Sequence, residues 1–114
     1  MEFKRLFTQE EAERTLPLVR GIVGDILAAA GRMRSLAEGD ADRADLESAL
    51  AEHFEELEEI GCFYKDWSFS VGLVDFPAEI DGEPVFLCWR SDEPELAYYH
   101  RIDEGYSGRR RLGS

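Results

Sequence analysis

The strongest constraint in this sequence is a run of apolar residues that recur every three or four positions between residues 12 and 37. Such spacing is typical of a helix with one continuous apolar stripe. Thr8 and Glu11 precede the run and match a capping box, in which each side chain accepts a hydrogen bond from the other residue's backbone amide. Pro17 lies inside the run, and a proline in a helix interior removes one hydrogen bond and clashes with the preceding turn. We therefore expect a short opening segment and then a main helix from about Leu16 to Ala37.

A second helix is expected from Asp42 or Ala44 to Ile60, because apolar residues again recur with helical spacing. Gly61 follows, and glycine readily adopts the left-handed conformation that ends many helices. The connection between the two helices is short. The sequence therefore predicts an antiparallel helical hairpin over residues 8–61.

The pattern changes after the second helix to that of β-strands. Three runs are rich in β-branched and aromatic residues: 71–76, 84–89 and 96–102. Asp81-Gly82 separates the first two and is typical of a two-residue hairpin turn. A five-residue turn, 91–95, separates the last two. The sequence thus predicts a three-stranded antiparallel β-meander over residues 70–102.

The length of 114 residues corresponds to one domain. With 44% hydrophobic and 33% charged residues, the composition is that of a globular protein. We expect one α+β domain over residues 1–114, in which the helical hairpin packs on the three-stranded meander. Residues 105–114 follow as a loose basic tail.

Turn lengths also predict the strand register. A two-residue turn places Asp75 opposite Cys88, and a five-residue turn places Cys88 opposite Tyr98. Side chains alternate between the two faces of a sheet. The face expected on the helices is apolar and holds Val74, Phe76, Val85, Leu87, Trp89, Ala97 and Tyr99. The opposite face, called here the mixed face, holds Leu73, Asp75, Phe86, Cys88, Arg90, Leu96, Tyr98 and His100.

The net charge of −12 argues against a nucleic acid or an anionic membrane as a partner. The longest uncharged stretch has eight residues, too few to span a bilayer, and the start of the chain lacks the apolar run of a signal peptide. We therefore expect a cytoplasmic protein. Cys62 and Cys88 should be reduced there, although a disulfide between them is geometrically possible.

Short motifs in a fixed order cover almost the whole chain. They are Phe7-Thr8 with Glu11-Ala12, Leu16-Pro17, Ile60-Gly61-Cys62, Lys65-Asp66, residues 72–77, Leu87-Cys88-Trp89, Glu93, His100, and Gly105-Tyr106 with Gly108-Arg109. This order resembles an uncharacterised prokaryotic family, domain of unknown function 2203. A glycine commonly precedes the family's glutamate, whereas this chain has Asp92 before Glu93. Because the family has no established activity, the resemblance implies no catalytic residue.

The candidate ligand-binding residues lie on or near the mixed face: Asp75, Cys88, Arg90, Glu93, His100 and Arg109. Carboxylate, thiolate and imidazole groups bind transition metals, so Asp75, Cys88 and His100 are an alternative metal site. In the competing structural interpretation, Asp75 pairs diagonally with Arg90 and Cys88 is a small buried side chain. We expect no cofactor, because the sequence has no phosphate loop, dinucleotide glycine pattern or HExxH motif.

The apolar stripe of the first helix is wider than a two-helix contact requires, because Ile22, Ala29 and Leu36 flank it. These residues could cover the sheet or form a homodimer interface. We expect a homodimer and a non-catalytic protein-interaction or self-assembly function, with an unknown protein partner as a further possibility. The alternative is a metal- or small-ligand-binding domain, or a weak enzyme, that uses the mixed face around Asp75, Cys88, Glu93 and His100.

Overall fold

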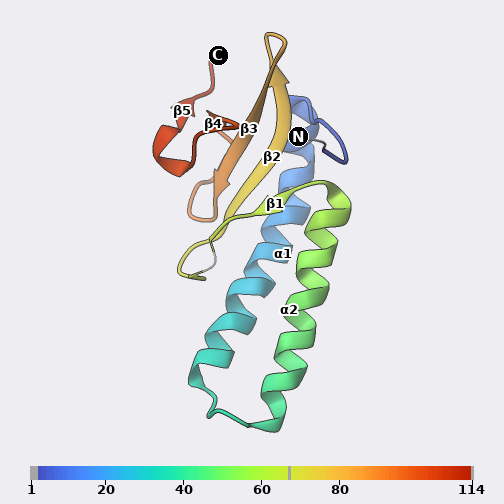
Figure 1. Ribbon diagram of the computed structural model, residues 1–114, viewed down its shortest axis with the longest axis vertical. Coiled ribbons are helices and arrows are strands. Elements are labelled where there is room, and N and C mark those ends of the chain that lie inside the picture. Colours follow the sequence, from blue (N-terminus) through green and yellow to red (C-terminus); the bar gives the residue numbers. More distant parts are fainter. Residues whose placement is uncertain (1–2, 67, 114) are drawn as a thin grey trace.

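The structure of the protein is a computed structural model that describes residues 3–66 and 68–113 (Figure 1). The outermost residues of the predicted domain and tail, 1–2 and 114, lie outside this description. Two helices, α1 (Gln9–Ser35) and α2 (Ala41–Ile60), form an antiparallel hairpin, and an antiparallel sheet follows. Its strands are β1 (Phe63–Tyr64), β2 (Leu73–Ile80), β3 (Glu83–Arg90), β4 (Tyr98–Arg101) and β5 (Arg110–Arg111), which lie side by side in this order. The predicted α+β fold is confirmed.

α1 begins with the predicted capping box. The Thr8 hydroxyl accepts a hydrogen bond from the Glu11 amide at 3.0 Å, and the Glu11 carboxylate accepts one from the Thr8 amide at 2.9 Å. The helix continues through Pro17 to Ser35, so the prediction of a separate opening segment is wrong. Ala12 before the proline and Val19 after it are both fully buried in one core. This shared packing outweighs the single hydrogen bond that Pro17 cannot make.

α2 begins and ends close to the predicted positions. The Asp40 carboxylate accepts a hydrogen bond from the Asp42 amide at 2.9 Å and caps the first turn. Gly61 ends the helix with a φ of 103°, the left-handed conformation expected there. Both cysteines are buried and free, so no disulfide crosslinks the domain.

The predicted strand registers are confirmed. Asp75 lies opposite Cys88, and Cys88 lies opposite Tyr98. Asp81 and Gly82 have φ angles of 52° and 81°, as a two-residue hairpin turn of this kind requires. The turn lengths therefore contained the information that aligns the three long strands.

The sheet has two more strands than predicted. β1 pairs with β2 through Phe63 and Asp75, and β5 pairs with β4 through Tyr98 and Arg111. Each added strand has two residues, which is too short to show alternation in the sequence. The tail after residue 105 is not loose: it forms a 3-10 turn at Tyr106–Gly108 and then β5, which corrects that prediction.

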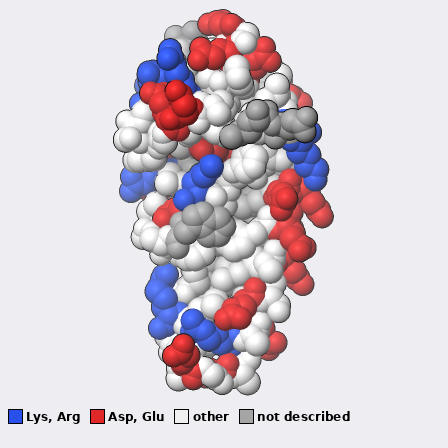
Figure 2. Space-filling model, viewed as in Figure 1, with Lys and Arg blue, Asp and Glu red and all other residues white. Residues whose placement is uncertain are grey.

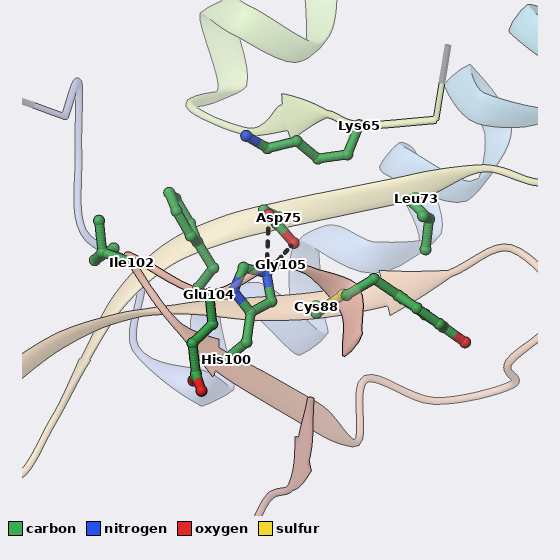
Figure 3. A pocket seen from close by; sticks show the side chains of 10 residues that line it. Lys65, Leu73, Asp75, Cys88, His100, Ile102, Glu104 and Gly105 are labelled. Atoms are coloured by element: carbon green, nitrogen blue, oxygen red, sulfur yellow. Dashed lines mark hydrogen bonds and ion pairs between the residues drawn. The ribbon is translucent and has the colours of Figure 1, made fainter. Parts of the chain in front are cut away.

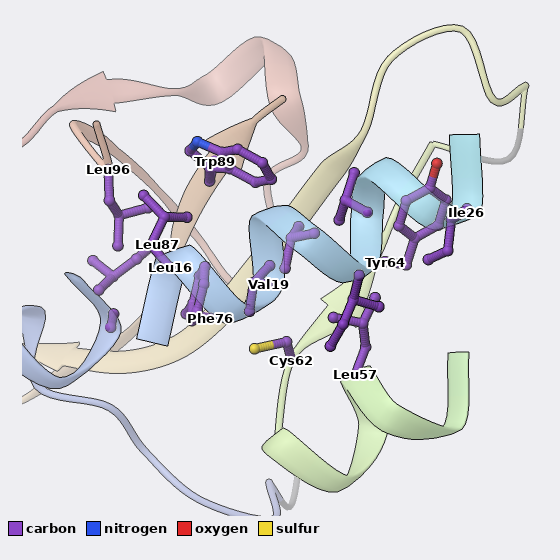
Figure 4. Packing of buried hydrophobic residues seen from close by; sticks show 14 of the residues in the cluster. Leu16, Val19, Ile26, Leu57, Cys62, Tyr64, Phe76, Leu87, Trp89 and Leu96 are labelled. Carbon is purple, nitrogen blue, oxygen red and sulfur yellow. The ribbon is translucent and has the colours of Figure 1, made fainter. Parts of the chain in front are cut away.

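The apolar face of the sheet packs on α1, as Figure 4 shows. Val74, Phe76, Leu87 and Trp89 are each at most 1% exposed, which confirms the assignment of this face. Leu96 was predicted on the mixed face but lies in the same core, with 4% of its surface exposed. It precedes the first residue of β4, so strand alternation does not determine its direction.

The wide apolar stripe of α1 is largely covered within one chain. Ile22 and Ala29 belong to the core and are 5% and 7% exposed, whereas Leu36 is half-buried. Ile22 and Ala29 were predicted at a homodimer interface, but they are not accessible on the surface. These two residues therefore pack in the core of their own chain and are not available for an interface with a second chain.

In Figure 2, acidic side chains gather along the edge of the molecule where α2 lies. The last turns of α2 carry four exposed glutamates: Glu55, Glu56, Glu58 and Glu59. Among the described residues, no helix combines the length and the apolar character that crossing a membrane requires.

Candidate metal centre

Three neighbouring strands bring Asp75, Cys88 and His100 together on the mixed face (Figure 3). Asp75 on β2 lies directly opposite Cys88 on β3, and His100 on β4 lies opposite Phe86, two residues before Cys88. All three residues are buried, with exposed fractions of 2–3%. One potential ligand atom from each lies within 4.8 Å of the other two. These residues are called the Asp–Cys–His triad below.

The two ring nitrogens of His100 have different partners. Nδ1 lies 2.9 Å from the backbone carbonyl oxygen of Arg101, which can only accept, so Nδ1 carries a proton. Nε2 lies 3.1 Å from both carboxylate oxygens of Asp75. The hydrogen bond to Asp75 raises the pKa of His100 above its ordinary value, although burial opposes this shift. In the metal-free protein, His100 and Asp75 therefore form a buried ion pair.

Cys88 is not an activated nucleophile in this environment. Burial raises the pKa of its thiol to about 12, and the neighbouring Asp75 carboxylate contributes to the increase. The thiol is therefore protonated at neutral pH. A bound metal ion is the ordinary way to convert such a buried thiol into a thiolate.

Glu93 and Arg109 hold the strand that carries Cys88 and are not part of the triad. Arg109 donates from Nη2 to the Glu93 carboxylate at 2.6 Å and to the Cys88 carbonyl oxygen at 3.2 Å. Its guanidinium carbon lies 4.0 Å from the ring centre of Tyr98 and 4.7 Å from that of Tyr106. These contacts fix the C-terminal segment against β3 and β4. We therefore assign both predicted site residues a positioning role.

The predicted diagonal pair between Asp75 and Arg90 is wrong. Arg90 lies opposite Leu73 in the register, and its Nε is 3.1 Å from the Asp92 carboxylate. It also donates to the Tyr106 hydroxyl at 2.9 Å. The Asp75 carboxylate is instead hydrogen-bonded to His100. The longer side chain of Arg90 reaches Asp92 and Tyr106, which lie nearer to solvent.

A cavity of about 220 Å³ adjoins the triad. Besides the triad, it is lined by Lys65, Leu73, Phe86, Ile102, Glu104, Gly105 and Tyr106 (Figure 3). Lys65 and Tyr106 were not among the predicted site residues, because Lys65 follows the two-residue strand β1 and Tyr106 begins the 3-10 turn, so neither lies in a periodic segment. Both, however, belong to the motifs quoted above for the family resemblance.

The triad fits a transition metal such as zinc in its chemistry. The set contains one carboxylate, one thiol and one imidazole, all of which zinc accepts. With ordinary zinc–ligand bond lengths, the ligand atoms of a tetrahedral site lie about 3.3–3.8 Å apart. In the structure, the three ligand atoms lie within 4.8 Å of one another. Small side-chain movements would therefore shorten these distances to those of a tetrahedral site. Three protein ligands would leave the fourth position of such an ion open, next to the cavity that the same residues line.

Residues 5–112 match the model of a family described as "Uncharacterized conserved protein (DUF2203)", and the chain belongs to this family. No curated protein and no solved structure matches the chain. The family description names no activity, so a functional proposal has to come from the geometry of the site.

Proposed function

We propose that this member of the DUF2203 family is a metal-binding domain in which Asp75, Cys88 and His100 hold a transition-metal ion, with zinc as the best fit. The observation that supports this most is the convergence of three ligand types, from three strands, in a buried position. His100 adds a second argument. Its Nδ1 proton is bound to a backbone carbonyl, the outer contact that metal-bound histidines usually make, and this leaves Nε2 for the metal.

The charges of the site agree with a divalent ion. With Asp75 and Cys88 both ionised and His100 neutral, a divalent ion gives a centre with no net charge. Metal binding has to displace the proton on His100 Nε2 and the thiol proton of Cys88. Metal affinity should therefore rise with pH, and loading should release protons into the solvent. We assign no reaction to the centre, and the open position makes it a ligand-binding site.

The proposal is tested by loading purified protein with Co²⁺ and recording the thiolate-to-cobalt absorption together with the metal content. We expect one cobalt ion per chain. Three variants should each lose this ion: Asp75→Asn, Cys88→Ser and His100→Gln. Cys62→Ser is the matched control, because Cys62 is equally buried but lies in the apolar core on the other side of the sheet.

Circular dichroism should show that the triad variants remain folded. The proposal is wrong if the wild-type protein binds no stoichiometric cobalt. It is equally wrong if folded triad variants bind cobalt as tightly as the wild type does.

A further inference from the structure

We propose that the cavity beside the metal centre binds a small organic monocarboxylate, whose charged group lies between the metal ion and the ammonium group of Lys65. This inference rests on the proposed metal centre. It goes beyond it by assigning the chemical class of the ligand at the open position.

Lys65 supplies a cation at this cavity. Its backbone amide donates to the Leu73 carbonyl oxygen at 2.8 Å, which fixes the start of the side chain beside β2. Its Nζ lies 5.4 Å from the ring centre of Phe86 and 5.5 Å from that of Phe63. In the view of Figure 3, Lys65 and His100 lie on either side of Asp75. Among the described residues, Lys65 has no carboxylate within ion-pair distance.

The other charged groups near the cavity already have partners. Glu104, which lines it, accepts hydrogen bonds from Arg110 at 3.2 Å and from the Arg101 amide at 3.1 Å. Arg90 and Arg109 are paired with Asp92 and Glu93. Among the charged side chains that line the cavity, Lys65 is therefore the one without an oppositely charged partner in the described part of the chain.

The sum of charges determines the class of ligand. The metal with its ionised ligands is neutral, as argued above, and Lys65 adds one positive charge. A single negative charge on the ligand balances the site. A carboxylate suits it, because oxygen is an accepted zinc ligand and an anion near an ammonium group gains a charge-assisted hydrogen bond.

The other residues that line the cavity favour an apolar hydrocarbon portion on this ligand. Leu73, Phe86 and Ile102 contribute apolar side chains to a cavity of about 220 Å³. This volume accommodates a short aliphatic chain or one ring, so the ligand should be a monocarboxylate with a few carbon atoms beyond its carboxyl group.

The test uses cobalt-loaded full-length protein, with changes in the visible cobalt spectrum and titration calorimetry as readouts. Butanoate should bind and alter the spectrum, and acetate should bind several-fold more weakly because each buried methylene adds affinity. Butanamide, which has the same shape without the charge, should bind at least about tenfold more weakly than butanoate. Lys65→Met should weaken butanoate binding by about fivefold or more without weakening cobalt binding, because it removes a positive charge and no metal ligand.

Lys4→Met is the matched control, because Lys4 is the only other lysine in the sequence and, like Lys65, is exposed, but it does not line the cavity. It should leave both affinities unchanged. If cobalt does not bind, the metal centre is wrong and this inference fails with it. If cobalt binds but butanoate does not, or butanoate binds equally to Lys65→Met, or butanamide binds as well as butanoate, the carboxylate site is wrong while the metal centre stands.

Discussion

Asp75 and His100 contact each other across β3, although their own strands do not pair. The His100 Nε2 atom lies 3.1 Å from both Asp75 oxygens, and the two residues are 25 positions apart in the sequence. Both side chains are buried, so their charges depend on each other. Removing one partner from a buried ion pair typically costs about 3–5 kcal/mol, because the other charge stays buried without compensation. This contact links the stability of the domain to the chemistry of the site.

The first prediction concerns the pH dependence of stability in the metal-free protein. The hydrogen bond to Asp75 raises the pKa of His100 in the folded state above its unfolded value of about 6.5. The stabilisation is therefore fully present below about pH 6.5 and is lost as the pH rises through the folded pKa. Urea denaturation across this range should show the unfolding free energy falling as the pH rises.

His100→Gln should abolish this loss of stability at high pH, whereas His53→Gln should retain it, since His53 lies on α2 outside the site. An unfolding free energy that is constant, or that rises, over the same pH range would contradict the ion pair.

The second prediction concerns the core on the opposite face of the sheet. Trp89 is fully buried, and its indole N–H donates to the Glu93 carbonyl oxygen at 3.0 Å. Trp89→Ala should lower the unfolding free energy by about 3–5 kcal/mol. Leu18→Ala is the control, because Leu18 is 57% exposed, and it should change stability by less than about 0.5 kcal/mol. A loss below about 1 kcal/mol for Trp89→Ala would show that this side chain does not anchor the core.

The third prediction concerns the close approach of Gly72 to α1. A Cβ atom at this position would lie 2.2 Å from Cγ1 of Val23. Gly72→Ala should therefore destabilise the protein by about 1–3 kcal/mol. The loss should be smaller in a Val23→Ala background, as chemical denaturation of the double mutant can show. By contrast, Gly24→Ala meets no atom within 4 Å and should stabilise α1 by about 0.5–1 kcal/mol.

The fourth prediction is the homodimer expected from the sequence. Of its three interface residues, only Leu36 is partly exposed, so Leu36→Glu is the variant that should dissociate a dimer with the least effect on the core. Light scattering at micromolar concentration measures the mass. A mass of one chain that does not change on dilution would contradict the dimer. A dimer that persists in the Leu36→Glu variant would place its interface elsewhere.

Features determined by local sequence were predictable. The Thr8 cap, the Gly61 helix end and the Asp81-Gly82 turn each depend on a few neighbouring residues. The turns then aligned the strands, and alternation placed Asp75 and Cys88 on one face. The candidate triad was therefore recognisable as a possible metal site before its geometry was known.

Features that depend on contacts between distant residues were not predictable. The pairing of Asp75 with His100 requires two side chains to meet across a third strand, which no register determines. The C-terminal segment is held by Arg109 between Tyr98 and Tyr106, and nothing local in the sequence signals this contact. The continuity of α1 through Pro17 likewise depends on tertiary packing.

The helical hairpin extends well beyond the sheet, as Figure 1 shows, and gives the molecule dimensions of 50 × 25 × 24 Å. At the far end, near the connection between α1 and α2, the helices lack the cover that the sheet provides elsewhere. Amide hydrogen exchange should therefore be fastest there and slowest in β2 and β3. Thermal opening of the hairpin tip can occur without moving the strands that carry the triad. The fold thus separates its most easily opened part from the strands that carry the triad.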